Sequence, residues 1–591
     1  MGISEVEVMI GNQAIALGLV EAGIDLAAAY PGTPSSEILP AVTEFKKRLK
    51  RDIHIEWSVN ERVAMEVAFG AAMAGKKAVC MMKQVGLNVA FPPFIKGREA
   101  AIRGGLLIVS CDDPGPQSSQ TEQDSRLIGT LFGVPVFDAP SPVEARLLAS
   151  HAMSYSVMHK IPVILRSTHR VSHAREAICL DNPATEKTAR LDDGLKTSGG
   201  SRFGIVASGM TYNVIADVLS DLGMEEAVSL YKVVRIFPFS NDLFEFARSI
   251  ENLLVVEETD EVLEALIGDR TRVFGRKSGH VPRQGELTYD VMRGIVQKVA
   301  GELGIPITAF SADTTIEAAI STVSFPQRPP RLCAGCPHRA SFYAMRQAFP
   351  KAVFPGDIGC YTLGISQGAV DTCLDMGSSV GLAAGFFNTF DQDGASVSIL
   401  ASIGDSTFFH AALPLLYDAV RKGGRFIIII MDNGTTAMTG MQPTPQSGMR
   451  AEGAGDHPIP IEHVVKGLGA EFLKIIDPYD IPGMIRTIRE AETHLKQGGK
   501  GPAVVIARRP CLLFVKAGKG GLGKPVDLTT DCTGCRRCVD LFGCPGFRFD
   551  ESEQKVRLDE ALCVSCGVCL FVCPQKTKGK GRRAGEFEKT Q

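Results

Sequence analysis

The sequence predicts an α/β protein: several doubly wound parallel sheets followed by a small cysteine-rich domain. Short apolar runs such as LLIVS and FIIIIM alternate with helical patterns over most of the chain, as buried parallel strands and their crossover helices do. Half of the 16 cysteines lie between Cys532 and Cys573, which indicates a metal-binding segment. The 591 residues are enough for about four domains.

The composition excludes several classes of function. The 63 basic and 66 acidic residues leave a net charge of −3, which argues against a general nucleic-acid-binding surface. No apolar run approaches the roughly 18 residues of a membrane span, and the N-terminus MGISEVEVMIGNQ lacks the pattern of a secretion signal. We therefore expect a cytoplasmic protein with no membrane or nucleic-acid partner, in which cysteines bind metal and do not form a disulfide framework.

Residues 1–185 are expected to form the first doubly wound domain. The strand before Tyr30 leads into the turn PGTPSSEI, and the small-residue-rich helix of VNERVAMEVAFGAAMAG precedes the strand KAVCMM. The last strand, PVILRS, is expected to leave four polar side chains on a loop: Arg166, Thr168, Arg170 and His173.

Two polar segments, 179–201 and 305–331, are interpreted as linkers. Between them, 200–305 repeats the strand–helix rhythm in FGIVASGM, VSLYKVVRIFP and NLLVVEE, and is expected to form a smaller α/β domain. Residues 325–515 form the third expected domain, which ends after the strand PAVVIARRP.

The third domain is organised around one strand–helix–strand crossover. Its first strand ends at Gly404-Asp405, a helix follows from about 408 to 421, and the second strand covers 425–431. Strands joined by such a crossover lie parallel and side by side. Asp405 and Asn433 therefore emerge at the same carboxyl edge of the sheet, where α/β proteins bind ligands.

The residues at this edge suit a cation that bridges to phosphates. Oxygens of Asp405 and Asn433, with a carbonyl near Thr435, are the ligands that Mg²⁺ prefers. The backbone can approach a diphosphate closely at the small residues Gly404, Ser406 and Gly434. GDS followed by DN is the signature of thiamine diphosphate enzymes. The alternative interpretation is an ordinary crossover whose Asp and Asn cap the following segments.

The cysteine-rich segment, 526–575, has the spacing of a bacterial ferredoxin with two [4Fe–4S] clusters. In that arrangement the fourth cysteine of each run ligates the cluster of the other run. One cluster would take Cys532, Cys535, Cys538 and Cys573, and the other would take Cys563, Cys566, Cys569 and Cys544. A pair of zinc sites is the alternative.

Two basic stretches carry no such chemistry. KAGKGGLGK matches most of a phosphate-binding loop, but Pro525 follows where that loop needs Ser or Thr, so we interpret it as a linker. The tail 576–591 is expected to be disordered, with nucleic-acid binding as a weak alternative.

Over nearly its whole length the sequence resembles the large (alpha) subunits of indolepyruvate:ferredoxin oxidoreductases, in the 2-oxoacid:ferredoxin oxidoreductase superfamily. The matching stretches are AAAYPGTPSSEI, VNERVAMEVAFGAAMAG, KQVGLNVA, DDPGPQSSQTEQDSR, LCAGCPHR, GDIGCYTLG, GDSTFFH and TTAMTG. The resemblance implies a pyrimidine-type thiamine diphosphate domain over 1–185 and a transketolase-C-like domain over 200–305. It also implies a diphosphate-binding thiamine domain over 325–515, before the ferredoxin domain.

The resemblance assigns a catalytic role to Glu61, the acid of the NE-x-x-A element. This carboxyl would hydrogen-bond the aminopyrimidine of thiamine diphosphate and promote formation of the reactive carbanion. Glu66 is the competing candidate, and a solvated acid at a helix N-terminus is the alternative for Glu61. The implied reaction is oxidative decarboxylation of an aryl or bulky, indolepyruvate-like 2-oxo acid to CO₂ and the acyl-CoA. Its electrons would pass through [4Fe–4S] clusters to ferredoxin.

A third [4Fe–4S] cluster is implied by related oxidoreductases, which hold one beside thiamine. The corresponding cysteines are Cys333, Cys336, Cys360 and Cys511, and buried free thiols are the alternative. Cys336 and His338 are expected at the cofactor, and His338 and Arg339 could contact substrate or diphosphate or form a structural pair. Side chains of the RSTHR loop are candidates for binding a substrate carboxylate or coenzyme A, or for fixing the loop.

The resemblance also implies partners: a smaller second subunit, a soluble ferredoxin, coenzyme A, and assembly as a dimer of heterodimers. The chain departs from the family at FPPFIKGREA, after KQVGLNVA, and at Thr444-Pro445, where the family tends to have His-Pro. Indolepyruvate and another bulky 2-oxo acid, such as a phenylpyruvate-like one, therefore fit equally well. Two other functions stay open: a non-redox thiamine diphosphate decarboxylase or ligase, and an electron-transfer or scaffold subunit of a larger redox complex.

Overall fold

The structure is a computed structural model of the chain, which divides into two compact units, Met1–Ser324 and Phe325–Gln591. The described residues are 6–99, 101–180, 191, 193–197, 200–268, 272–307, 314–324, 329–394, 396–455, 457–516 and 532–575. The segment GKGGLGK and the tail 576–591 lie outside them.

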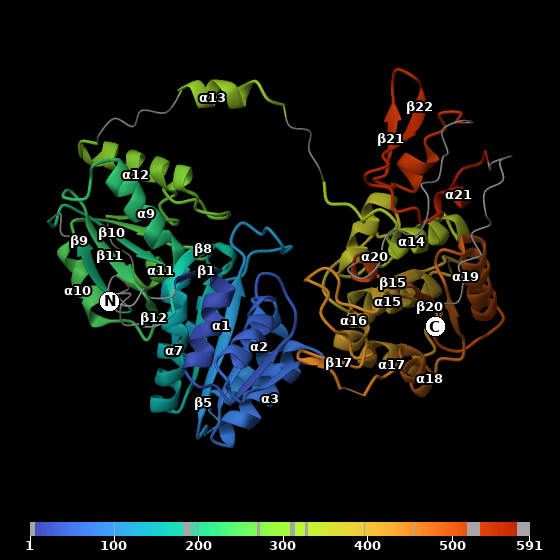
Figure 1. Cartoon of the computed structure of the whole chain (residues 1–591), viewed down its shortest axis with the longest axis horizontal. Coiled ribbons are helices and arrows are strands. Elements are labelled where there is room, and N and C mark those ends of the chain that lie inside the picture. The colour runs from blue at the N-terminus through green and yellow to red at the C-terminus, as the bar shows by residue number, and fades with distance from the viewer. Residues whose placement is uncertain are drawn as a thin grey trace. The chain divides into compact units, whose positions relative to one another are not determined.

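The first unit contains a sheet of seven strands in the order β12-β6-β7-β5-β4-β2-β3. Figure 1 labels two of them, β5 and β12. Its strands are β2 (Leu26–Ala29), β3 (His54–Trp57), β4 (Lys77–Lys83), β5 (Gly105–Asp112), β6 (Val136–Asp138), β7 (Pro162–Thr168) and β12 (Arg235–Phe237). All neighbours are parallel except β12, which runs antiparallel to β6. Every residue of β5 and β7 is buried, because parallel strands are covered on both faces.

Helices connect and cover these strands. α1 (Gly11–Glu21) packs against both α2 (Ile38–Arg48) and α7 (Pro142–His159), and α3 (Glu61–Met73) packs on β2 and β4. The shorter helices are α4 (Gly86–Val89), α5 (Phe91–Gly97), α6 (Ser125–Phe132) and α8 (His169–His173). β1 (Val6–Ile10) pairs antiparallel with β8 (Arg175–Cys179).

A second sheet of the same unit has the order β14-β13-β10-β11-β9. Its strands are β9 (Gly194–Thr197), β10 (Phe203–Ser208), β11 (Ser229–Val233), β13 (Asn252–Val256) and β14 (Val273–Phe274). The helices of this region are α9 (Met210–Asp221), α10 (Asn241–Ser249), α11 (Val262–Ile267) and α12 (Tyr289–Leu303). Apolar side chains of α9 and α12 share a core with β10 and β13.

The structure differs from the sequence expectation at both linkers. β9 lies inside 179–201 and pairs with β11, and α13 (Thr314–Ser321) lies inside 305–331. β12 belongs by sequence to the second expected domain, yet it extends the first sheet because Arg235 pairs with Phe137. A tertiary pairing of this kind leaves no local sequence pattern. The domain boundaries themselves stay predictions.

The second unit is built on a parallel four-stranded sheet in the order β15-β16-β20-β19. Its strands are β15 (Leu400–Gly404), β16 (Ile427–Asp432), β19 (Leu473–Ile476) and β20 (Ala503–Arg508). The main helices are α14 (Pro337–Ala348), α15 (Ser378–Gln392), α17 (Leu413–Arg421) and α19 (Ile481–Lys496), and α20 (Leu512–Lys516) follows the sheet. α15 and α17 pack together, and α14 packs against α19.

The cysteine-rich part of this unit contains a hairpin of β21 (Phe547–Asp550) and β22 (Lys555–Leu558), and the short helix α21 (Cys569–Val572). Phe542, Val568 and Val572 share an apolar core with Tyr343 of α14. The cysteine-rich part and the sheet domain are therefore packed together. No helix of the described residues combines the length and apolar character that a membrane span requires.

Candidate active site

The carboxyl edge of β15 and β16 gathers the polar residues expected from the crossover. The two strands are parallel neighbours, with Gly404 opposite Met431. Asp405, the first residue after β15, is buried, and its Oδ2 accepts a hydrogen bond from the backbone N–H of Gly434 at 2.9 Å. Its Oδ1 accepts from the N–H of Ser406 at 2.9 Å.

Two residues that sequence reasoning missed complete the surroundings of Asp405. Gln446 Nε2 donates to Asp405 Oδ2 at 3.0 Å and also to Oδ1 of Asp432, the last residue of β16. Burial, and next the charge of Asp432, raise the pKa of Asp405 to about 7. Asp432 is already paired with Arg508 at 2.6 Å, whereas no Lys or Arg among the described residues forms an ion pair with Asp405, so Asp405 is the acid suited to ligate a cation. Asp432 could have been predicted at this site because it directly precedes Asn433 in the sequence. No sequence pattern indicated Gln446.

Asn433 is buried and directed at a histidine. Its Nδ2 lies 3.2 Å from Nε2 of His338, and its Oδ1 accepts from the backbone N–H of Thr435 at 3.1 Å. Burial lowers the pKa of His338 to about 4, so its ring is neutral and Nε2 can accept from the amide. Thr435 in turn donates through Oγ1 to the carbonyl of Gln442 at 3.1 Å. Asn433 Oδ1 and the Thr435 carbonyl keep acceptor capacity for a cation.

The backbone at this edge needs glycine. A Cβ on Gly404 would lie 2.3 Å from the ring of Tyr361, and Gly434 has φ +75°, which other residues rarely adopt. Ser406 Oγ accepts from Thr436 Oγ1 at 2.9 Å. The helix that follows β15 contains a π-helical turn, Phe408–Ala412, a distortion often found beside functional sites. The donor set and the close backbone suit Mg²⁺ and a diphosphate.

Four cysteines lie beside this edge: Cys333, Cys336, Cys360 and Cys511. Burial raises the pKa of Cys336 to about 12, and the thiols of Cys360 and Cys333 add to that shift. Burial also raises the pKa of Cys360 to about 11, helped by Cys511 and Cys333. The four thiols are therefore electrostatic neighbours. The backbone N–H of Cys511 donates to the carbonyl of Asn433 at 3.0 Å, which ties this group to the carboxyl edge.

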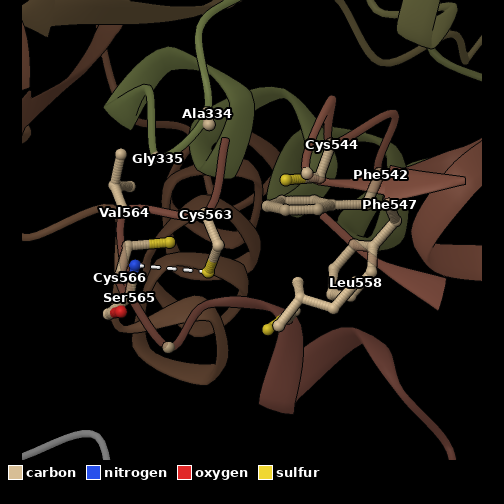
Figure 2. Close-up of a pocket in the computed structure, with 13 residues that line it drawn as sticks. Ala334, Gly335, Phe542, Cys544, Phe547, Leu558, Cys563, Val564, Ser565 and Cys566 are labelled. Atoms are coloured by element: carbon tan, nitrogen blue, oxygen red, sulfur yellow. Dashed lines mark hydrogen bonds between the residues drawn. The ribbon is translucent and has the colours of Figure 1, made fainter. Parts of the chain in front are cut away.

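The eight cysteines of the C-terminal segment lie around two small pockets. Cys544, Cys563, Cys566 and Cys569 surround one pocket, and Cys532, Cys535, Cys538 and Cys573 surround the other. Figure 2 shows Cys544, Cys563 and Cys566 turned toward the first pocket, against an apolar wall that includes Phe547 and Leu558. Among the described residues, no three His, Cys, Asp or Glu side chains meet at a point where one metal ion could sit.

Backbone N–H groups point at several of these sulfurs. Ser565 N–H donates to Cys563 Sγ at 3.4 Å, and Val556 N–H donates to Cys532 Sγ at 3.3 Å. Each pocket therefore offers four thiols, apolar walls and N–H donors. This donor set suits a [4Fe–4S] cluster, whose potential depends on hydrogen bonds to sulfur.

Glu61 lies in the first unit, at the N-terminus of α3, where Asn60 caps the helix through the N–H of Val63 at 2.9 Å. Glu61 is only 5% exposed, although it is charged in its ordinary state. A Cβ on Gly86 would lie 2.5 Å from Glu61 Cγ, so the first residue of α4 packs directly on this side chain. Glu66, by contrast, is an exposed partner of Arg62.

The prediction of a polar loop after β7 is wrong. Arg166 and Thr168 belong to the buried end of β7, and Arg170 and His173 lie on α8. Arg166 donates to Asp112 at 2.6 Å, to Asp138 at 3.0 Å and to the carbonyl of Glu258 at 2.8 Å. These partners occupy its guanidinium, so Arg166 joins the two sheets of the first unit and is not available to bind a substrate.

Family comparisons match three parts of the chain. Residues 357–507 match the C-terminal TPP-binding domain of thiamine pyrophosphate enzymes. Residues 17–200 match the thiamine diphosphate-binding domain of pyruvate flavodoxin/ferredoxin oxidoreductases, and residues 195–274 match the indolepyruvate ferredoxin oxidoreductase middle domain. The predicted class of thiamine diphosphate-binding α/β domains is confirmed.

Several relatives are similar over nearly their whole length. The chain is 37% identical to indolepyruvate oxidoreductase subunit IorA of Archaeoglobus fulgidus, over 96% of both chains. It is 36% identical to the subunit of the same name from Thermococcus kodakarensis, over 96% of both chains. It is also 36% identical to that of Methanothermobacter marburgensis, over 97% of both chains. The similarity therefore extends across both units.

Proposed function

The chain belongs to the indolepyruvate oxidoreductase IorA family, among the thiamine diphosphate-dependent 2-oxoacid:ferredoxin oxidoreductases, and from this premise we propose its reaction. It oxidises an aryl or bulky, indolepyruvate-like 2-oxo acid to CO₂ and the acyl-CoA, and passes the electrons through [4Fe–4S] clusters to ferredoxin. The observation that carries this proposal is the hydrogen bond from Cys511 to Asn433, because it joins the carboxyl edge to a group of four thiols.

At the carboxyl edge, the chain's own residues hold the cofactor. Asp405, Asn433 and the carbonyl of Thr435 bind Mg²⁺, while Gly404 and Ser406 approach the diphosphate. Neutral His338 orients the Asn433 amide through its 3.2 Å contact, and Cys336 stands two residues before it. Bound thiamine diphosphate supplies the nucleophilic carbon and electron sink for decarboxylation of a 2-oxo acid.

Glu61 is the proton-transferring carboxyl that activates the cofactor. Its burial supports this role, because a desolvated carboxyl can hold a strong hydrogen bond to an aminopyrimidine nitrogen. The exposed Glu66, paired with Arg62, fits the role poorly. Glu61 lies in the first unit and the carboxyl edge lies in the second, so the proposal assigns residues of each unit a role.

Three groups of thiols form the electron path. The group nearest the carboxyl edge is Cys333, Cys336, Cys360 and Cys511; the next is Cys563, Cys566, Cys569 and Cys544; the last is Cys532, Cys535, Cys538 and Cys573. The first two groups are neighbours, because Gly335 precedes Cys336 of the first group and also lines the pocket formed by the second group. This contact supports the proposed order of electron transfer. Each group holds a [4Fe–4S] cluster, which accepts and releases one electron at a time.

The same proposal includes partners. A smaller second subunit completes the enzyme, which assembles as a dimer of heterodimers and uses coenzyme A and a soluble ferredoxin. We also propose a cytoplasmic location, where cysteines stay reduced and available to ligate metal. The first departure begins with FPPFIKG, which forms α5, and Thr444-Pro445 lies just before Gln446. We propose that both departures adapt the site to its particular bulky 2-oxo acid.

The test is anaerobic reduction of the iron–sulfur chromophore by a panel of 2-oxo acids, with and without coenzyme A. The chain would be co-expressed with its second subunit and supplied with thiamine diphosphate and Mg²⁺. We expect bleaching by indolepyruvate or phenylpyruvate and little by pyruvate. A protein without iron would favour a non-redox thiamine enzyme. Bleaching by no 2-oxo acid, with iron and thiamine bound, would favour an electron-transfer subunit with a silent thiamine site.

A further inference from the structure

Arg339 is a buried cation without a carboxylate partner. It lies on the first turn of α14 and is 1% exposed. Among the described residues, no Asp or Glu forms an ion pair with it. An uncompensated charge in the protein interior is strongly unfavourable, so such a residue normally has a counter-charge close by. The counter-charge of Arg339 must come from something else.

Backbone carbonyls hold the guanidinium in one orientation. Nη1 donates to the carbonyl of Phe542 at 2.9 Å and to that of Gly543, and Nη2 donates to that of Leu332. Gln367 donates to the Phe542 carbonyl at 3.2 Å and to the Arg339 carbonyl at 3.4 Å. Arg339 therefore links the backbone just before Cys544, in the cysteine-rich part, to the backbone just before Cys333.

One donor of Arg339 is left over. Its Nε–H is buried and has no hydrogen-bond partner in the part of the chain that the structure describes. A buried donor without a partner is unfavourable, and such cases call for an acceptor that the protein itself does not supply. The guanidinium is thus fixed by three carbonyls and still offers one N–H to a further group.

The surroundings indicate which group this is. The titratable groups that act on Arg339 are cysteines of two expected cluster sites, Cys544 and Cys566 of one and Cys336 and Cys333 of the other. The carbonyls that Arg339 binds directly precede Cys544 and Cys333. Burial lowers the pKa of Arg339, and these cysteines act in the opposite direction. An arginine stays protonated at any physiological pH. Arg339 is therefore a permanent positive charge between two sites that become negative when clusters are bound.

We propose that Arg339 tunes electron transfer by stabilising the reduced state of the two clusters between which it lies, through its charge and its Nε–H. This inference rests on the proposed function. When an electron enters either neighbouring cluster from 2-oxo acid oxidation, the negative charge of that cluster increases by one. The fixed guanidinium stabilises this charge without gaining or losing a proton. Arg339 is thus a positioning residue: it touches neither the substrate nor thiamine diphosphate.

The experiment compares Arg339→Gln, Arg339→Lys and the control Arg346→Gln in the co-expressed holoenzyme. Arg346 is on the same helix but donates to the carbonyl of Pro350 and lies over Phe354, away from the cysteine groups. Midpoint potentials of each cluster would be measured by redox titration with mediators, followed by electron paramagnetic resonance, together with iron content. These readouts need no 2-oxo acid, so failure of the proposed substrate class would not affect them.

In Arg339→Gln, we expect the two neighbouring clusters to become at least tenfold harder to reduce, which is about 59 mV for a one-electron couple. The cluster of Cys532, Cys535, Cys538 and Cys573 should keep its potential, as should all clusters in Arg346→Gln. Arg339→Lys keeps the charge but loses the planar fork, so its shift should be smaller. Unchanged potentials in an iron-replete Arg339→Gln would overturn the proposal.

If Arg339→Gln fails to retain iron, the iron content and cluster potentials of Arg339→Lys test the proposal instead. Arg339→Lys with full iron and a small shift confined to the two neighbouring clusters supports tuning by Arg339. Full iron with unchanged potentials, or an equal shift in all three clusters, overturns it. If both variants lose the cluster of Cys544 without any shift at Cys333 and Cys336, Arg339 only docks the cysteine-rich part, and the proposal is wrong.

Discussion

The backbone N–H of Cys511 donates a hydrogen bond to the carbonyl of Asn433 at 3.0 Å. Asn433 belongs to the edge at which Mg²⁺ and diphosphate are expected, and Cys511 belongs to the nearest group of thiols. A hydrogen bond between the two backbones fixes their separation, since both lie just beyond the ends of adjacent parallel strands. Under the proposed function, decarboxylation and electron removal would therefore occur at neighbouring positions.

Asp405→Asn should weaken binding of thiamine diphosphate with Mg²⁺ by roughly 10- to 100-fold, because a charged ligand interaction of about 1.5–3 kcal/mol is lost. Isothermal titration calorimetry would measure this dissociation constant. Asp418→Asn is the matched control, because Asp418 is an exposed residue of α17 in the same crossover. Equal affinities in both variants would mean that Asp405 does not hold the cation.

Cys511→Ser should reduce the iron content from about twelve to about eight atoms per chain, since one of three [4Fe–4S] clusters loses a ligand. Iron analysis of anaerobically purified protein would measure it. Cys373→Ser serves as the control, because Cys373 lies in the same unit but outside the three groups of thiols. A wild-type content of about eight, unchanged in Cys511→Ser, would leave the nearest group as free thiols.

Glu61→Gln should lower the rate of 2-oxo acid-dependent cluster reduction by about 10²- to 10⁴-fold, with thiamine diphosphate still bound, because the amide cannot transfer the proton. Stopped-flow spectroscopy would follow the bleaching. Glu66→Gln should keep the rate, since Glu66 is exposed and paired with Arg62. The opposite pattern, with Glu66→Gln inactive, would reassign the role.

Lys83 should react with amine-directed reagents at unusually low pH. Burial lowers its pKa to about 8, although Asp113 partly opposes the shift, so about half of this amine is neutral and nucleophilic at pH 8. Its labelling by an excess of N-hydroxysuccinimide acetate, measured by mass spectrometry, should rise through pH 8 and then level off. A labelling profile of Lys83 that keeps rising well above pH 8 would contradict the lowered pKa.

Arg166→Leu should lower the free energy of unfolding by about 3–5 kcal/mol, because Asp112 and Asp138 would be left as buried charges without a cation. Denaturant unfolding followed by circular dichroism would measure it. Arg175→Leu, at an exposed position of β8, should change stability little. Normal stability of Arg166→Leu with a raised KM for the 2-oxo acid would restore Arg166 as a substrate ligand.

The crossover was predictable from sequence because its signals are local. The strand before Asp405, the intervening helix and the strand before Asn433 follow one another along the chain, and the handedness of parallel connections brings their ends together. Gln446 was not predictable, since its amide reaches Asp405 and Asp432 through the fold of a loop. Arg166 was assigned to a loop for a related reason. Polar residues at the end of a strand resemble a polar loop in sequence, and the carboxylates that pair with the buried arginine come from distant parts of the chain.

The sequence by itself determined the α/β class, the edge built from Asp405 and Asn433, and the spacing of the C-terminal cysteines. These depend on periodicity and on short spacings, which the local chain dictates. Only the tertiary structure decided that β12 extends the first sheet, that Cys511 meets Asn433, and that Arg339 binds the carbonyls just before Cys333 and Cys544. Each of these relationships joins segments far apart in the chain. The packing of whole elements brings such segments together, and no local pattern encodes it.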